Sequence, residues 1–581
     1  MATVDENRRG IAALRDALDR FGLDPVHLVV GNVALVALVA RLYGLGARVA
    51  HWDEGRVAYW TVRYIETGNV EYRPIIHGPF YHHVNQHLFA LFGATDFSMR
   101  LVVAVSGGLF PLVALLFRHR LRDGAVAALA LLFAVNPVLL YYSRFMRGDP
   151  LVAAFMFTAF ALFVGAIDTH RTVYVHAGVV FTALGFTVKE NALLYLVCWI
   201  GAGALVLDYR LLRHGDDLDR WAIVSGQVLR GWRLFRRRWL TVVLAAVEFL
   251  VVVVYFYAPR RATEPGPGLW TVLADPSVLP AVVWAGTGGA WTDLWGQWVS
   301  GSHQEHPYLP FLNDFLSTMA YGALALSLLA LLGFVVDRYS SRGPSDLVSF
   351  CSYWGAASVL GYPLVTDIKA PWATVNAVVP LAVPAAVGLA VVGRWGYSAY
   401  RDADYVTAGL GGLAVTLLVV SMLATSAGAV YVNPQSSENG LVQYAQPADD
   451  IGPVTDQFSV AAADGGPGPD VLLYGEYFVT ESDSTGPREP QCAKWFNALP
   501  LPWYFAASDA NVTCARSPDE VRTTVNESQP PVVAVRESQA GDIEEHLADY
   551  ESRTYRLRAW GTETTFYVHQ EYADDLPPPE R

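Results

Sequence analysis

Long runs of apolar residues divide this chain, and they constrain its fold more than any other feature. About eleven of them are long enough to cross the ~30 Å hydrocarbon core of a bilayer. They cover residues 28–48, 99–117, 124–142, 150–167, 173–188, 190–208, 239–258, 312–336, 347–365, 371–393 and 407–431. Because 53% of the 581 residues are hydrophobic and only 16% are charged, the runs predict a polytopic, all-α membrane domain at 28–431.

The basic residues between these runs predict which way the domain faces. Arg and Lys concentrate in loops on one side, at 118–122, 168–172, 210–238, 337–342 and 394–401. By the positive-inside rule, these loops lie in the cytoplasm. The Arg-rich N-terminal residues 1–27 are predicted to form a cytoplasmic amphipathic segment. Two long loops, 50–98 and 259–311, then lie outside the cell with everything after residue 431, although Arg260 and Arg261 are exceptions to the rule.

The segment 432–581 differs from the rest of the chain in composition. It holds 25 acidic against 9 basic residues, whereas the whole chain has a net charge of −13. Apolar runs at 471–474, 532–535 and 565–568 predict buried strands, and 542–552 predicts a helix between two of them. We therefore expect a small extracytoplasmic α/β domain. Its acidic surface excludes a nucleic-acid partner, and the use of only three lysines in the chain favours a halophilic archaeon as its source.

The four cysteines fall into two classes. Cys198 and Cys351 lie within apolar runs and are expected to be core residues. Cys492 and Cys514 lie in the acidic segment and are candidates for a disulfide if that segment is outside the cell. The same segment carries two glycosylation sequons, at 511–513 and 526–528.

Charged residues gather at the predicted outer ends of the apolar runs. Asp53 and Glu54 come directly after the first run, where carboxylates are unfavourable unless they have a role. Asp53 is the candidate general base or metal ligand, with Glu54 in support. Basic groups that suit a lipid phosphate lie at other outer ends. The remaining candidates for binding substrate or lipid phosphate are His77, Arg144, Arg147, Asp149, Lys189, Glu190, Lys369 and Trp372.

Each candidate also has a structural interpretation. Asp53 and Glu54 would cap the helix that follows them, and Asp149 stands at a helix N-terminus before a proline. Arg144 and Arg147 would reach the membrane interface from buried stems, while Lys189 and Glu190 would pair with each other. A divalent cation is the one cofactor considered. Its candidate ligands are Asp53, His303 and His306.

Four short motifs occur in the order found in a known group of membrane enzymes. They are HWDE at 51–54 with IIHGPFY at 75–81, YSRFMRGDP at 142–150, TVKEN at 187–191 and IKAPW at 368–372. Together they span roughly residues 28–393, and each is weak alone. In this order they resemble the protein O-mannosyltransferases and glycosyltransferase family 39, which belong to the GT-C superfamily. Among related groups, the chain is most similar to an archaeal membrane family labelled "flippase activity-associated".

The resemblance implies a function for the chain. It implies a membrane glycosyltransferase that moves a sugar from a dolichyl or other polyprenyl phosphate to a glycan or protein acceptor outside the cell. No phosphate-binding loop for a nucleotide is present, which fits a lipid-linked donor. The alternative is a flippase, or a flippase-associated protein, that binds the lipid-linked sugar without transferring it.

Overall fold

The protein is described by a computed structural model of the 581-residue chain. It describes residues 24–213, 220–262, 266–299, 307–341, 343–366, 368–443, 445–481, 486–559, 561–573 and 576. Most of the predicted N-terminal segment, and the candidate metal ligands His303 and His306, lie outside the described residues.

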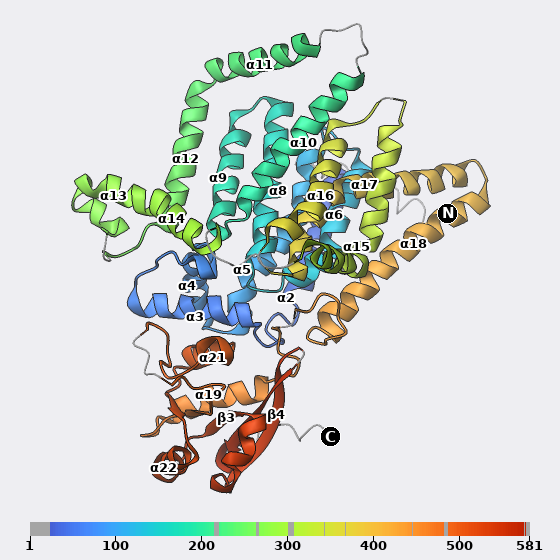
Figure 1. The fold of residues 1–581 in the computed structure, drawn as a ribbon. Coiled ribbons are helices and arrows are strands. Elements are labelled where there is room, and N and C mark those ends of the chain that lie inside the picture. The colour runs from blue at the N-terminus through green and yellow to red at the C-terminus, as the bar shows by residue number, and fades with distance from the viewer. Residues whose placement is uncertain are drawn as a thin grey trace, which may run out of the picture.

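A bundle of apolar helices occupies most of the chain before residue 432 (Figure 1). Within the described residues, eight helices are long and apolar enough to cross a membrane: Pro25–Leu42, Asp96–Phe117, Gly148–Thr169, Ala192–Arg213, Trp239–Tyr257, Tyr308–Arg338, Pro371–Arg401 and Tyr405–Val432. The helices α6 (Asp123–Val135), α9 (Thr172–Val188) and α16 (Asp346–Val365) complete the bundle. All the predicted apolar runs therefore fall on helices, which confirms the predicted membrane fold, although fewer than eleven helices meet the span criteria.

The centre of the bundle is α17 (Val375–Arg401), which packs against α6, α8 (Gly148–Thr169), α15 (Tyr308–Arg338), α16 and α18 (Tyr405–Ala427). Glycines allow its closest approach to α15. A β-carbon at Gly333 would collide with the carbonyl oxygen of Pro384, and one at Gly388 with that of Leu329. Lipid tails are as apolar as Leu side chains, so close backbone contact of this kind is a main source of helix association in membranes.

One end of the bundle faces the C-terminal domain, and we call it the domain-facing end (Figure 1). Helix α3 (Trp52–Thr67) lies there and packs against α4 (Phe80–Phe92) and against α21 (Leu501–Ser508) of the C-terminal domain. Ile65 of α3 is exposed, whereas Val57 and Tyr64 are buried in the protein. The reason is that α21 and α4 cover the face that would otherwise meet the membrane.

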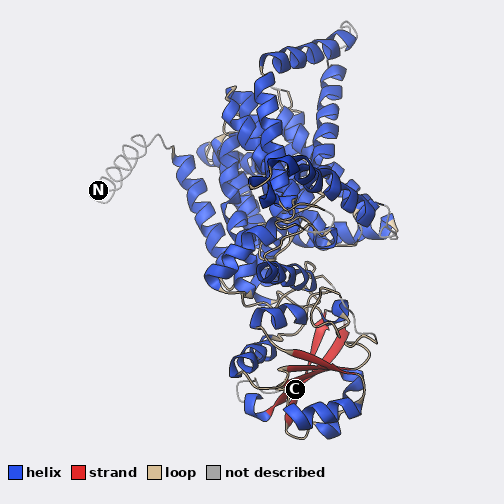
Figure 2. Cartoon of the chain, turned by 90° about the vertical axis from the view of Figure 1, so that its left-hand side faces the viewer, coloured by secondary structure: helices blue, strands red, loops and turns tan. Residues whose placement is uncertain are grey.

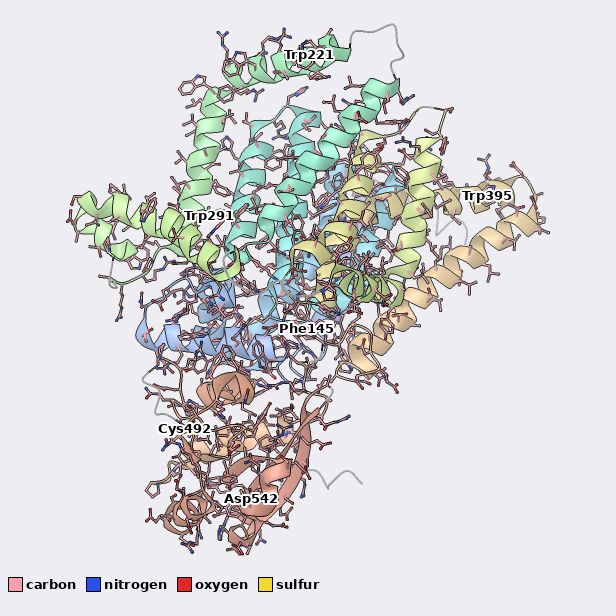
Figure 3. The ribbon with its side chains drawn as sticks, in the orientation of Figure 1. Phe145, Trp221, Trp291, Trp395, Cys492 and Asp542 are labelled. Carbon is pink, nitrogen blue, oxygen red and sulfur yellow. A yellow bond between two sulfur atoms is a disulfide. The ribbon has the colours of Figure 1, made fainter. Side chains whose placement is uncertain are left out.

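The opposite end of the bundle carries α11 (Arg220–Arg237), which lies across the end of α12 (Trp239–Tyr257) (Figures 1 and 3). Apolar side chains that include Trp221 and Trp232 are exposed along α11, and it ends in consecutive arginines. On one side of the bundle, the short helix α13 (Leu279–Trp284) projects away from α12, whereas α14 (Ala290–Leu294) lies beside one end of α12. The two ends of the bundle therefore differ in chemistry.

The C-terminal domain contains a five-stranded sheet in the order β2-β1-β3-β5-β4 (Figure 2). The strands are β1 (Val471–Tyr474), β2 (Val512–Ala515), β3 (Val532–Arg536), β4 (Tyr550–Arg558) and β5 (Gly561–His569). The first three are parallel, with Val471 opposite both Val512 and Val532, and β5 and β4 add antiparallel. Helices α19 (Gly452–Asp464), α21 and α22 (Pro518–Ser528) accompany the sheet.

The sequence prediction for this domain was right for its strands and wrong for one helix. The predicted strands coincide with β1, β3 and part of β5. The predicted helix at 542–552 is instead two short 3-10 turns, Glu537–Asp542 and Glu544–His546, followed by the start of β4. Ile543 and Leu547 are both buried and four residues apart, which imitates a helical pattern. From residue 550 onward, pairing with β5 determines the backbone.

Candidate functional site

The site begins at the first turn of α3. His51 caps this helix: its Nδ1 accepts a hydrogen bond from the backbone N–H of Asp53 (3.0 Å), and its own N–H donates to Glu54 Oε2 (2.9 Å). Burial lowers the pKa of His51 to about 3, so its imidazole is neutral and suited to accepting. The predicted capping interpretation of the acidic pair therefore applies to Glu54. The carboxylate of Asp53 does not take part in this helix cap.

Asp53 forms ion pairs with two arginines. Arg56 Nη2 donates to Asp53 Oδ1 (2.7 Å), and Arg147 Nη1 donates to Oδ2. Only 9% of Asp53 is exposed. Burial alone would raise the pKa of Asp53, but Arg147 and Arg56 hold it well below its ordinary value. Asp53 is therefore an ionised carboxylate held by two cations, and it is a weak base for as long as both stay in place.

Asp149 and Lys189 form a second charge pair beside the first. Asp149 stands at the start of α8 and accepts from Lys189 Nζ (2.9 Å) and Asn191 Nδ2 (3.2 Å). The next residue, Glu190, does not pair with Lys189 as sequence reasoning allowed. It accepts from Tyr72 OH (2.7 Å), and His77 Nδ1 lies 3.1 Å from its other oxygen.

The backbone around His77 is held in an unusual conformation. His77 has φ +64°, a left-handed value that a residue with a side chain adopts at some cost in energy. The N–H of Gly78 donates to Val188 O (3.1 Å), and a β-carbon at Gly78 would collide with the carbonyl of Thr187. The segment before α4 is therefore locked against the segment that carries Lys189 and Glu190.

These residues enclose one small polar cavity, which we call the charged pocket. It is lined by Asp53, Arg56, Val57, Ile76, His77, Tyr81, Met146, Arg147, Gly148, Asp149, Val188 and Lys189. Its volume is about 20 Å³, which is room for roughly one water molecule. Two carboxylates face three permanent cations, so the pocket suits an anion. The ion pairs must open before a group as large as a phosphate can enter.

Five predicted site residues do not line the charged pocket: Glu54, Arg144, Glu190, Lys369 and Trp372. Glu54 is fully buried, and both of its oxygens accept hydrogen bonds. The donors are Arg100, Arg48 and the backbone N–H groups of His51 and Met146. Arg144 donates to the carbonyls of Ala40, Arg41, Tyr43 and Gly44, where α2 (Pro25–Leu42) ends. Lys369 pairs with Asp314 (3.4 Å) at a different cavity.

Trp372 lies behind the charged pocket. The guanidinium carbon of Arg147 is 3.3 Å from the centre of its ring, and His51 meets the ring edge-on. Trp372 is 3% exposed, so Arg147 occupies the face that sequence reasoning offered to a sugar. Its role in the structure is to hold Arg147 in place through a cation–π contact.

Sequence reasoning missed several residues of this site. Arg56 follows Asp53 by three positions on a helix, a spacing that predicts an ion pair. The sequence indicated Arg48 and Arg100 less clearly as site residues, because each stands inside a predicted apolar run. Within the described residues, no group of three or more His, Cys, Asp or Glu side chains is arranged to hold a metal ion.

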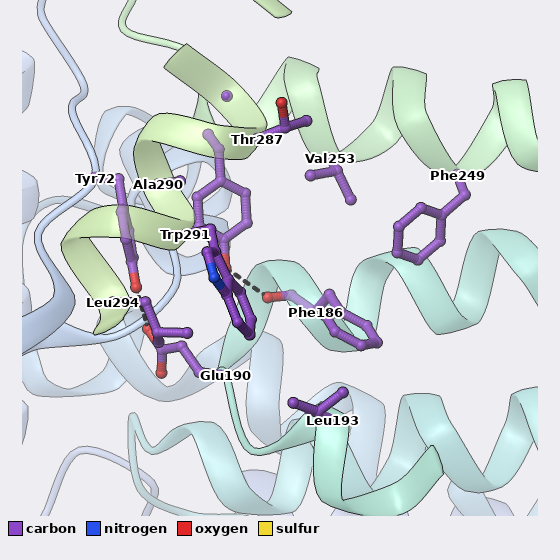
Figure 4. Close-up of a pocket in the computed structure, with 12 residues that line it drawn as sticks. Tyr72, Phe186, Glu190, Leu193, Phe249, Val253, Thr287, Ala290, Trp291 and Leu294 are labelled. Atoms are coloured by element: carbon purple, nitrogen blue, oxygen red, sulfur yellow. Dashed lines mark hydrogen bonds between the residues drawn. The ribbon is translucent and has the colours of Figure 1, made fainter. Parts of the chain in front are cut away.

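An apolar cavity of about 240 Å³ adjoins this cluster (Figure 4). Its walls come from α9, α12 and the segment that contains α14, and they include Phe186, Phe249, Val253 and Trp291. Glu190 and Tyr72 stand at one end of it. Glu190 lines the apolar cavity and His77 lines the charged pocket, so this hydrogen-bonded pair lies between the two cavities.

The C-terminal domain is fastened to the same end of the bundle. Asp96 at the start of α5 (Asp96–Leu109) accepts from Trp503 Nε1 (2.9 Å) and Tyr504 OH (2.8 Å). Cys492 and Cys514, the candidate pair, form a disulfide at the edge of this domain (Figure 3).

Two family models match separate parts of the chain. Residues 76–216 match the model described as dolichyl-phosphate-mannose-protein mannosyltransferase, and residues 451–570 match the model described as Agl23 flippase-associated protein C-terminal domain. The first match includes His77, Arg144, Arg147, Asp149, Lys189 and Glu190. No curated protein matches the chain significantly.

Solved structures show a similar fold. ArnT from Cupriavidus metallidurans in the apo state has 16% identity and a TM-score of 0.52, over 95% of this chain and 99% of its own. ArnT bound to undecaprenyl phosphate has 17% identity and a TM-score of 0.52, over 96% and 100%. The Archaeoglobus fulgidus oligosaccharyltransferase has 14% identity and a TM-score of 0.47, over 95% and 74%. The two ArnT structures show that the chain shares their fold, and together with the match of residues 76–216 they confirm the predicted resemblance. The long apolar helices agree with a multi-pass membrane protein.

Proposed function

We propose that this chain is a membrane glycosyltransferase that moves a sugar from a polyprenyl phosphate to an acceptor hydroxyl on the extracytoplasmic side. One observation carries the proposal: Asp53 and Arg147 form an ion pair in a pocket that also contains Asp149 and Lys189. A carboxylate and cations placed together are what transfer from a lipid phosphate requires, because one accepts a proton and the others stabilise the leaving phosphate.

The donor would occupy both cavities. The apolar cavity takes the first isoprene units of the lipid, since its walls are almost entirely hydrocarbon. The phosphate then lies beyond Glu190 and His77, in reach of Arg147 and Lys189. A lipid-phosphate donor is supported by the similarity in fold to ArnT, which was solved with undecaprenyl phosphate, and by the match to the dolichyl-phosphate-mannose family model.

Binding of the phosphate would activate Asp53. A phosphate competes with Asp53 for Arg147, because a guanidinium binds either group in two-point contact. Once Arg147 turns to the phosphate, Asp53 loses its strongest partner, its pKa rises toward the ordinary value, and one oxygen becomes available.

The transfer step forms one bond to the anomeric carbon and breaks another. Asp53 takes the proton of the acceptor hydroxyl as its oxygen attacks the anomeric carbon of the sugar. The bond from that carbon to the phosphate oxygen breaks, and the polyprenyl phosphate leaves with the electron pair. Arg147 and Lys189 stabilise the charge that develops on it. Attack from the side opposite the phosphate inverts the anomeric configuration.

Three features support an extracytoplasmic position for this site. The disulfide in the adjoining domain is typical of proteins in oxidising surroundings. The arginines that end α11 lie at the opposite end of the bundle, as the positive-inside rule requires of a cytoplasmic loop. The exposed tryptophans Trp284, Trp291 and Trp295 are suited to a membrane interface.

The test is transfer by purified protein given radiolabelled polyprenyl-phosphate sugar and an extract of cell-surface glycans. We expect Asp53→Asn to lower the rate about 10²–10⁴-fold, the range for loss of a general base. The control is Asp519→Asn, which removes a carboxylate from an exposed helix of the C-terminal domain. Thermal unfolding and gel filtration show whether both variants are folded. Transfer by folded Asp53→Asn at the wild-type rate would refute the proposal.

The second candidate function is movement of a lipid-linked sugar across the membrane. The match of residues 451–570 to a flippase-associated domain favours it. Proteoliposomes with the lipid-linked sugar in one leaflet separate the two functions. A protein that carries the lipid across but never forms a glycosidic bond supports transport, whereas transfer that depends on Asp53 supports the enzyme.

A further inference from the structure

A second cavity, of about 370 Å³ and with both polar and apolar walls, lies at the domain-facing end of the bundle. Three segments form it: the start of α15, residues 369–371, and residues 437–443, which lead into the C-terminal domain. Pro371 lines it, and the next residue, Trp372, is the one that holds Arg147. The cavity is therefore linked to the charged pocket through Trp372 and its contact with Arg147. It has a volume within the range of ordinary ligand sites.

One of its polar groups has no partner. Gln443 is 6% exposed, and its buried Oε1 accepts no hydrogen bond within the described structure. A buried acceptor without a donor is unfavourable, so its presence calls for an explanation. The neighbouring Asn439 is different, because its amide is fully used in holding the backbone of residues 429, 433 and 441. Gln443 is thus the group in this wall that is ready for a ligand.

The other polar groups are arranged for a ligand that both donates and accepts. Lys369 Nζ and Asp314 Oδ2 are 3.4 Å apart, and both side chains are partly exposed. Phe311 and Phe315 contribute an apolar wall. An anion would meet the Asp314 carboxylate and the Gln443 oxygen unfavourably. A neutral polyol suits all three, because its hydroxyl groups donate to Gln443 and Asp314 and accept from Lys369.

We propose that this cavity binds a neutral sugar residue of the acceptor, so that the protein extends an existing glycan. The inference rests on the proposed function, and it removes Lys369 from the set of groups that hold the donor phosphate. The sugar ring lies against Phe311 and Phe315, with hydroxyl groups on Gln443, Asp314 and Lys369. Its neighbouring free hydroxyl then points past Trp372 toward Asp53.

Binding is tested without the transfer reaction. The full-length protein in lipid nanodiscs is mixed with methyl glycosides of glucose, mannose, galactose and N-acetylglucosamine, and saturation-transfer NMR detects the bound sugar. We expect at least one glycoside to bind. Gln443→Met keeps the size of the side chain and removes its acceptor, and we expect binding to weaken about tenfold or more. Lys369→Met should weaken it as well.

Two controls assign the binding to this cavity. Glu438→Gln changes an exposed residue of the same segment that does not line the cavity, and it should bind as the wild type does. Asp53→Asn should also keep binding, because the acceptor sugar is held elsewhere. Loss of binding in folded Asp53→Asn would instead place the sugar at the donor site and overturn the proposal.

Other outcomes would also overturn it. They are no binding by any glycoside, binding unchanged in both Gln443→Met and Lys369→Met, or displacement of the sugar by millimolar inorganic phosphate, which would indicate an anion site. In the transfer assay, Gln443→Met should raise KM for the acceptor about tenfold and leave KM for the donor unchanged. Sugar binding without any transfer by the wild type would refute the proposed function and leave this site in place.

Discussion

Asp53 and Glu54 are adjacent carboxylates with opposite surroundings. Glu54 is enclosed by Arg100, Arg48 and two backbone N–H groups, and it holds the turn before Arg147 through the N–H of Met146. Asp53 lines a cavity and is held only by side chains that a ligand could attract. Glu54 therefore holds this part of the structure together, whereas Asp53 faces the charged pocket.

Glu54→Gln should destabilise the fold more than it changes the chemistry. The amide would leave Arg100 and Arg48 without a counter-charge in a buried place, a change that costs about 3–5 kcal/mol in soluble proteins. We expect the thermal unfolding midpoint in detergent to fall by several degrees. The exposed Glu438→Gln is the matched control. An unchanged midpoint for Glu54→Gln would show that Glu54 does not hold this part of the structure.

The stability that Glu54 contributes to the fold depends on pH. Burial alone would raise the pKa of Glu54, but Arg100 and Arg48 hold it well below its ordinary value. The stability contributed by this carboxylate is therefore present above its unfolded pKa of about 4.3, and it is lost as the pH falls toward the lower folded value. The difference between the wild-type and Glu54→Gln midpoints should shrink below about pH 4.

The sequence predicted part of the charged pocket from residue types and their places at the ends of apolar runs. Asp53, Arg147, Asp149 and Lys189 meet there, as expected of groups at the same end of the bundle. The pairing was less predictable: Lys189 binds Asp149 rather than its neighbour Glu190. Pairing depends on side-chain direction, which the order of helices does not determine.

The sequence did not distinguish Arg144 and Lys369, which lie outside the charged pocket, from the basic residues that line it. Both are basic groups at the domain-facing end, so sequence position could not distinguish them from Arg147 and Lys189. Arg144 donates hydrogen bonds to the backbone carbonyls at the end of α2. Lys369 faces a second cavity, although Trp372, three residues later, contacts Arg147.

At the scale of elements, α9, α12 and α14 together form the apolar cavity that leads to Glu190 (Figure 4). The segment of α14 was expected only as part of a long loop rich in Gly, Pro and Trp. In the structure it is helical and closes one wall, with Trp291 and Leu294 directed at Phe186 and Leu193. Which helices this segment would contact could not be predicted from its sequence.

Ala290→Phe should narrow this cavity and make the enzyme sensitive to the length of the donor lipid. Ala290 is 8% exposed and lines the cavity, so a phenyl ring would occupy space meant for isoprene units. We expect KM for a long polyprenyl donor to rise about tenfold, consistent with about 0.8 kcal/mol per buried CH₂. KM for a donor that carries a methyl group in place of the polyprenyl chain should change little, because such a donor does not enter the cavity. The control is Ala281→Phe, an exposed position on α13. An equal rise for both donors would contradict a lipid role for the cavity.

At the scale of the whole molecule, the two ends of the bundle differ in their cavities and charged residues. The domain-facing end combines the charged pocket, both neighbouring cavities and the C-terminal domain, which Asp96 fastens through Trp503 and Tyr504. The opposite end carries the arginines of α11. The sequence predicted the separate acidic domain well, because that prediction depends on composition averaged over many residues.

The central claim is that Arg147 and Lys189 bind the phosphate of a lipid carrier and thereby release Asp53. An experimental structure of the full-length protein with a bound polyprenyl phosphate tests it most directly. The account predicts phosphate oxygens within hydrogen-bond distance of Arg147 and Lys189, the lipid between α9, α12 and α14, and an Asp53 oxygen no longer paired with Arg147. A phosphate bound between Lys369 and Asp314, with the Asp53–Arg147 pair intact, would contradict it.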